Sequence, residues 1–341
     1  MVKKTTISCV ISIILAQLLI LCSCENNSTE KSDPAKCEHN FIDVLGAPPT
    51  CTESGKTDGS ECSECGLILL PQAVIEPLGH SYKDGVCEVC NAEQYESKGL
   101  EYSSYGNGTC CILSIGACTD ERVIIPSKSP NGDTVISIAK DAFKYSNITQ
   151  VSLPNTLSEI GESAFWGCTV DTVVLPENLK RIESYAFCLS KLKSISFNDS
   201  LEYIGDSAFA NTLLENVILM ESVKEIGSRA FYNCVNLKHI DLECSVQFLS
   251  VATFAQNYAL ESITLPNSIA SLSYREFEDC TNLNSITLGS ELASIEKDTF
   301  SGCSALRTIC FTGTRARWNS VTKPYGWDSD LINYKVVCTD D

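Results

Sequence analysis

Cysteine and histidine residues crowd into one short segment of the chain, residues 37–90. The segment contains two C-x-x-C motifs. It also contains two histidines, and each histidine is followed two residues later by an aromatic residue. Structural zinc takes four thiolate or imidazole ligands in a tetrahedron, so eight such residues suit two zinc ions. The predicted ligands are Cys37, His39, Cys51, Cys62, Cys65, His80, Cys87 and Cys90.

Disulfide bonds, or a mixture of disulfides and metal, remain alternatives for these cysteines, because the segment is predicted to lie outside the cytoplasm. A C-x-x-C pair forms a strained disulfide when it closes locally, whereas it clamps zinc well, which favours the metal. Few apolar residues are present to form a core, so either link would be structural. The spacing resembles that of small zinc-ribbon-like modules, and we predict such a module over residues 37–95.

The N-terminus has the features of an export signal. A positively charged start precedes the apolar run Ile7–Leu21, which is too short for a comfortable membrane span. The run ends in Leu-Cys-Ser-Cys, which resembles a bacterial lipoprotein signal cleaved before Cys24. The resemblance implies a diacylglycerol on Cys24, and two or three acyl chains anchor stably. We therefore predict a signal peptide over residues 1–23 and a flexible tether over residues 24–36. An uncleaved anchor and a plain secretory signal are the alternatives.

The remainder of the chain is organised by phenylalanines that recur every 22 or 23 residues. They are Phe143, Phe165, Phe187, Phe209, Phe231, Phe254, Phe277 and Phe300. Each follows an aliphatic residue by five positions and precedes a strand-like pattern such as Leu237–Leu242. A fixed period of this length indicates a solenoid. One coil cannot bury its own apolar face, so coils must stack, and each Phe becomes a buried rung.

The repeat frame L-x-x-L-x-L-P-x-x-L-x-x-I-G-x-x-A-F-x-x-C is closely matched from Leu153 to Cys168. This frame resembles the BspA-like leucine-rich repeat over about residues 100–341. The resemblance implies a repeat solenoid, a horseshoe of the α/β class with short parallel strands on the concave face and an irregular convex side. We predict about eight coils over residues 141–311. An N-terminal cap and first coil would occupy residues 96–140, and a C-terminal cap residues 312–341.

Outward-pointing strand residues would form the concave face, which is the usual binding surface of such horseshoes. Most of them are Ser, Thr or amides, with one charged centre around His239. The residues predicted to bind a partner are Asp171, Glu215, Ile218, Lys238, His239 and Asp241.

Several function classes are disfavoured. The formal net charge of −18 argues against a nucleic-acid partner, because phosphate contacts need clustered Lys and Arg. The sequence contains no dinucleotide fingerprint, phosphate loop, Ser–His–Asp order signature or zinc-peptidase box. His239 and Asp241 share a strand face but have no accompanying nucleophile. We therefore predict no enzyme, no catalytic residues and no catalytic cofactor, with zinc having a structural role only.

The features together favour a lipid-anchored, adhesin-like binding protein of the bacterial cell envelope, extracytoplasmic and surface-exposed. Its partner would be a protein or glycan on a host or neighbouring cell. It would contact the membrane through the N-terminal lipid anchor. The family resemblance implies adhesion to host matrix proteins, host cells or other bacteria. The alternatives are an envelope structural or assembly scaffold and a carbohydrate-capture lipoprotein.

Overall fold

The computed structural model of the protein describes residues 40–45, 47, 55–65, 67–75, 82–83, 86–87, 96–244 and 246–341. The chain divides into two compact units, Met1–Gln94 and Tyr95–Asp341. Among the described residues, no helix is long and apolar enough to cross a membrane. The boundaries assigned above to the signal peptide, tether, module and caps stay predictions.

The first unit is built from short antiparallel strands. One sheet has the order β1-β3-β4, and two further pairs are β2–β5 and β6–β7. The bounds are β1 Phe41–Val44, β2 Gly55–Lys56, β3 Gly59–Cys62, β4 Ile68–Leu70, β5 Val74–Ile75, β6 Tyr82–Lys83 and β7 Val86–Cys87. The turn between β3 and β4 holds one of the two C-x-x-C motifs.

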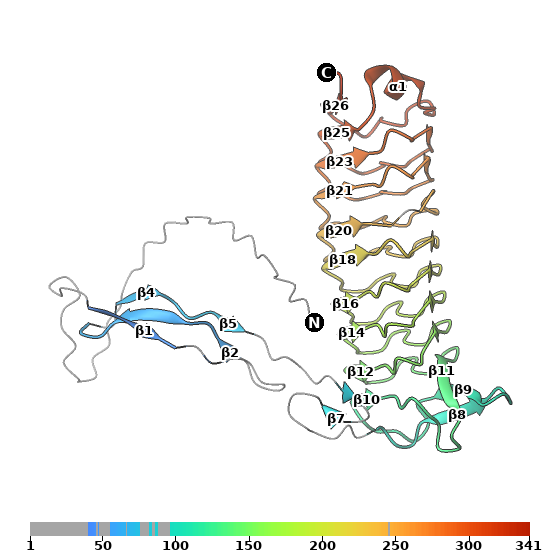
Figure 1. Ribbon diagram of the computed structural model, residues 1–341. Coiled ribbons are helices and arrows are strands. Elements are labelled where there is room, and N and C mark those ends of the chain that lie inside the picture. Colours follow the sequence, from blue (N-terminus) through green and yellow to red (C-terminus); the bar gives the residue numbers. More distant parts are fainter. Residues whose placement is uncertain are drawn as a thin grey trace, which may run out of the picture. The chain divides into compact units, whose positions relative to one another are not determined.

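The second unit is a solenoid in which each coil adds one strand to a first row of parallel strands (Figure 1). The row consists of β10 Arg122–Ile124, β12 Gln150–Ser152, β14 Thr172–Val174, β16 Ser194–Ser196, β18 Asn216–Leu219, β20 His239–Leu242, β21 Ser262–Thr264, β23 Ser285–Leu288, β25 Thr308–Phe311 and β26 Lys335–Val337. Exposed and buried residues alternate along these strands, as the sequence pattern predicts. The pairing is interrupted between β16 and β18 and between β20 and β21.

A second row of strands runs along the segment that was expected to be irregular. Its bounds are β8 Glu101–Ser104, β9 Thr109–Ser114, β11 Thr134–Ile138, β13 Glu159–Ile160, β15 Arg181–Ile182, β17 Tyr203–Ile204, β19 Glu225–Ile226, β22 Ser271–Leu272 and β24 Ser294–Ile295. Most of these strands contain two residues, which is too short for an alternating pattern to be visible in the sequence. From β11 onwards, each strand of this row contains the buried aliphatic residue that lies five positions before a ladder Phe, such as Ile204 before Phe209.

The predicted phenylalanine ladder is confirmed. All eight rings are at most 1% exposed. Rings of adjacent coils stack with centroids 5.0–5.9 Å apart and interplanar angles of 3–15°. The ladder is therefore a continuous column of stacked aromatic rings inside the solenoid.

The turn around each ladder Phe contains two residues with positive φ, one two positions before the Phe and one two positions after it. Around Phe209 these residues are Ser207 and Asn211. Backbone N–H groups of the turn donate to the next coil: Phe209 to Ala230 O and Asn211 to Tyr232 O, both at 2.8 Å. The turns thus form a third hydrogen-bonded ladder, which offsets the cost of a left-handed conformation at residues that are mostly not glycine.

Seven of the eight small residues three positions after a ladder Phe are buried, Ser146 being half-buried, and several bond to a ladder carbonyl. The Sγ of Cys280 donates to Phe254 O at 3.1 Å, and that of Cys303 donates to Phe277 O at 3.0 Å. Both are free thiols. Burial raises the pKa of the Cys280 thiol to about 12, so the thiolate form is disfavoured.

The two ends of the solenoid differ from its coils. At the N-terminal end β8 and β9 form an antiparallel hairpin whose turn contains Asn107 and Gly108, and β9 pairs with β11. At the C-terminal end helix α1 (Arg315–Ser320) buries Trp318. Trp327 contacts Trp318 and packs edge-on against Phe300 with centroids 6.3 Å apart, so it ends the aromatic column.

Candidate binding face

The outward side of the first strand row, called here the strand face, is an array of short polar side chains in register. Ser262 lies beside Ser285, and Thr264 beside Thr287. Between them, buried residues such as Ile263 point into the core. On these coils the face is therefore lined by hydroxyl groups, with a regular spacing set by the coils.

Five of the six predicted partner-binding residues lie together on two adjacent coils. Ile218 on β18 is the register partner of Asp241 on β20. Lys238 N donates to Glu215 O at 2.9 Å, which fixes these two residues side by side. His239 projects from the same face of β20 as Asp241, and all five side chains are exposed. These residues form the mixed patch, which combines both charge signs, an imidazole and an aliphatic group.

Asp171 is separated from the mixed patch. It is half-buried and lies two coils from Glu215, linked through Lys193: Lys193 N donates to Asp171 O at 2.8 Å, and Glu215 N to Lys193 O at 3.3 Å. The interruption between β16 and β18 falls between these coils. The charge alternates along this column, because each coil contributes one residue of opposite sign to its neighbour. The structure thus groups five of the six predicted residues and leaves Asp171 apart.

The predicted metal-ligand set can be followed only in part. Cys62 and Cys65 are 1% and 8% exposed; Cys62 ends β3 and begins the tight turn on which Cys65 lies. Two buried thiols on one such turn fit a zinc knuckle, since thiolate sulfur is a preferred zinc ligand. Cys87 lies on β7, of which only the backbone is described. The other predicted residues lie outside the described part of the chain: Cys24, Cys37, His39, Cys51, His80 and Cys90.

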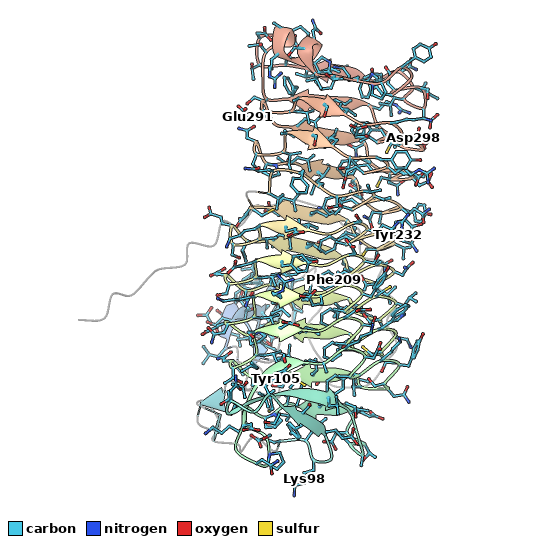
Figure 2. All side chains as sticks on the ribbon, turned by 90° about the vertical axis from the view of Figure 1, so that its right-hand side faces the viewer. Lys98, Tyr105, Phe209, Tyr232, Glu291 and Asp298 are labelled. Carbon is cyan, nitrogen blue, oxygen red and sulfur yellow. The ribbon has the colours of Figure 1, made fainter. Side chains whose placement is uncertain are left out.

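The structure also reveals a feature that the sequence analysis missed. The edge formed by the left-handed turns, called here the turn edge, carries a groove of about 540 Å³. Figure 2 shows Tyr232 and Asp298 on this edge, Glu291 on the other edge and Phe209 between them. The signal in the sequence was a tyrosine within three residues of a ladder Phe, as at Tyr185, Tyr232 and Tyr274.

The stacked coils, the parallel strand row and the phenylalanine column define a leucine-rich-repeat solenoid. The family model for the BspA type leucine rich repeat region matches the chain in six copies, over residues 127–238 and 224–320. The chain belongs to this family. BspA-type repeat proteins are bacterial surface proteins, and repeats of this kind generally serve as structural or binding scaffolds rather than as enzymes.

Similar solved structures come from several bacteria. A leucine-rich repeat protein from Bacteroides ovatus shares 21% identity at a TM-score of 0.49, covering 72% of this chain and 78% of that one. The T. pallidum leucine-rich repeat protein shares 27% sequence identity at a TM-score of 0.48, and the match covers 70% of this chain and 99% of that one. The pneumococcal vaccine antigen PcpA shares 22% sequence identity at a TM-score of 0.41, and the match covers 63% of this chain and 71% of that one. A search of the curated proteins found no match.

Proposed function

We propose that this protein is a lipid-anchored binding protein of the bacterial cell surface, adhesin-like, whose strand face contacts a protein or glycan on a host or neighbouring cell. The observation that carries the proposal is the mixed patch, where Ile218 and Asp241 lie side by side among hydroxyl-bearing residues. Ile218 is 50% exposed, and an exposed aliphatic group within a polar array is a suitable centre for a contact surface.

Surface exposure is tested by treating intact cells with protease. We expect the solenoid to be cleaved on intact cells, because an adhesin must reach its partner. Protection on intact cells with cleavage after lysis would contradict the adhesin and favour the envelope scaffold. A variant with Cys24→Ala should lose the lipid and be released into the medium, and its retention in the membrane fraction would contradict the lipid anchor.

The role of the strand face is tested by attachment of the labelled full-length protein to host-cell monolayers and to other bacteria. Ile218→Asp should weaken attachment about tenfold or more, because a charge replaces the exposed apolar centre. The matched control is Val174→Asp, which replaces an aliphatic residue 66% exposed on β14, outside the mixed patch. Equal attachment by the wild type and the Ile218 variant would contradict the proposed face.

We also propose that the cysteine-rich segment holds structural zinc, with Cys62 and Cys65 as two of its ligands. Both thiols are buried on one turn, which is the local geometry that a knuckle requires. Metal analysis of protein purified without chelator should find about two zinc ions, and Cys62→Ser should lower that number. No zinc together with no titratable thiols in the segment would instead establish disulfides.

A further inference from the structure

Along the turn-edge groove, coils that contribute a tyrosine alternate with coils that contribute none. Tyr185, Tyr232 and Tyr274 belong to every second coil, those of Phe187, Phe231 and Phe277. The coils between contribute no aromatic residue to the lining: they supply the buried Ala210 and Ala252, each 3% exposed, together with Ser207, Val251 and the amides Asn211 and Gln256. The ladder Phe rings of successive coils have centroids 5.3–5.9 Å apart along this part of the stack. The result is an elongated hollow that runs along the stack with an aromatic residue at each second rung.

The rim of the groove is held in place by its own contacts. The guanidinium of Arg275 lies 4.9 Å from the ring centroid of Tyr274 and pairs with Glu278 at 3.2 Å. These contacts orient the Tyr274 ring, which remains 39% exposed. An aromatic ring that is already ordered loses little conformational entropy when a ligand binds to it.

The groove is electrically balanced, although the chain carries a formal charge of −18. Two cations, Arg229 and Arg275, line it together with two acids, Glu278 and Asp279. A ligand selected by its charge, such as a phosphate or a sulfated chain, would find no net attraction here. Planar guanidinium, amide and carboxylate groups offer paired donors or acceptors, which suit neighbouring hydroxyl groups on one ligand.

The backbone of the turn edge is already hydrogen-bonded and is therefore poorly suited to an extended peptide. Asn211 N donates to Tyr232 O at 2.8 Å, and Asn233 N donates to Ala255 O at 2.9 Å. Peptides that add to a sheet need a free strand edge, and these turns do not provide one. Recognition in the groove must come from side chains, namely aromatic faces and planar polar groups.

We propose that the turn-edge groove binds a neutral oligosaccharide chain lying along the stack. The apolar face of a sugar ring packs on tyrosine rings, and its hydroxyl groups bond to the planar polar side chains between them. The groove lies on a different edge of the coils from the mixed patch, so this site is independent of the strand face.

The test is calorimetric titration of the full-length protein with a panel of linear hexasaccharides. Maltohexaose, cellohexaose and xylohexaose are the neutral probes, and hexagalacturonate is the acidic one. We expect at least one neutral chain to bind and the acidic chain to bind more weakly. No binding of any neutral probe at millimolar concentration, or tighter binding of the acidic probe, would overturn the proposal.

Variants then locate the site. Tyr232→Ala should weaken binding of the best neutral probe about tenfold, whereas Tyr232→Phe, which keeps the ring, should stay close to wild type. Tyr274→Ala gives a second measurement if the first variant melts at a lower temperature. The control is Tyr145→Ala, since Tyr145 is 66% exposed and lies outside the lining of the groove.

The same titrations separate this proposal from the one for the strand face. Ile218→Asp should leave oligosaccharide affinity unchanged while it weakens attachment to cells. Unchanged binding in both tyrosine-to-alanine variants, or loss of binding only in the Ile218 variant, would refute the groove as the site and leave the strand-face proposal standing.

Discussion

The strand face and the turn edge belong to the same coils but are built on different principles. On the strand face, Ser262 and Ser285 are neighbours whose side chains point away from the core. On the turn edge, the chain bends around a buried Phe through two left-handed residues, and its amides bond to the next coil. Side chains of the strand face can therefore be replaced without changing the backbone. On the turn edge, by contrast, the same residues determine both the packing around the buried Phe and the backbone conformation.

This difference predicts where substitutions act. A residue of the turn contributes to the aromatic column, to the third hydrogen-bonded ladder, or to both. An outward strand residue contributes mainly its side chain, because its backbone bonds are the same for any residue. Four substitutions, from the largest expected effect to the smallest, test the contrast.

Phe209→Ala should give the largest loss. The ring is fully buried between Phe187 and Phe231, so its removal leaves a cavity and costs about 3–5 kcal/mol of unfolding free energy. Urea denaturation followed by circular dichroism measures the loss. The control is Phe248→Ala, because Phe248 is 58% exposed, and it should cost far less. Equal losses in the two variants would contradict the ladder as the main source of stability.

Glu276→Thr should stabilise the protein at neutral pH. Glu276 takes the position before a ladder Phe that is alanine in five other coils, and neither of its fully buried carboxylate oxygens has a hydrogen-bond partner in the described chain. Threonines occupy the position in the adjacent coils, and Thr253 and Thr299 bond to carbonyls of their own turns. Relieving the unpaired carboxyl should raise the unfolding free energy by about 1–3 kcal/mol.

The pH dependence of the unfolding free energy provides a second test of Glu276. Burial raises the pKa of Glu276 well above its ordinary value of 4.5. As the pH rises above about 4.5, the Glu276 carboxyl ionises in the unfolded chain but stays protonated in the folded one. The free energy of unfolding therefore falls as the pH rises towards the folded-state pKa. The advantage of Glu276→Thr should therefore be larger at pH 7 than at pH 4. An advantage that grows on acidification would contradict this account, and exposed Glu261→Thr is the control.

Leu189→Gly isolates the cost of the left-handed turn. Leu189 has a φ of 59° and is 52% exposed, so its side chain contributes little packing. Glycine adopts this conformation freely, whereas alanine keeps the strain. The glycine variant should be more stable than Leu189→Ala by about 1 kcal/mol, as measured by thermal denaturation. An alanine variant at least as stable as the glycine variant would show that the turn is not strained.

Ser262→Ala should have the smallest effect. Its side chain is exposed on the strand face, and its backbone pairs with β23 whatever the side chain is. The unfolding free energy should change by less than about 0.5 kcal/mol. A loss above 1 kcal/mol, comparable with that of a turn residue, would remove the distinction between the two sides.

The sequence predicted those features that repeat as side-chain identity. The period of the phenylalanines gave the solenoid and its rungs, and the alternation in segments such as Leu237–Leu242 gave the outward positions of the strand row. These predictions succeeded because burial selects residue type directly: a position inside the stack must be apolar in almost every coil. Five of the six residues proposed for binding could be placed together for the same reason.

Features that depend on backbone conformation or on distances between coils were decided only by the tertiary structure. Left-handed φ values at residues such as Tyr185 and Leu189 carry no glycine signal, because hydrogen bonds to the next coil hold them. The groove arises because alanines of one coil lie between tyrosines of its neighbours. Residue types alone fixed what each coil must bury, while the stacking of coils fixed what their surfaces bring together.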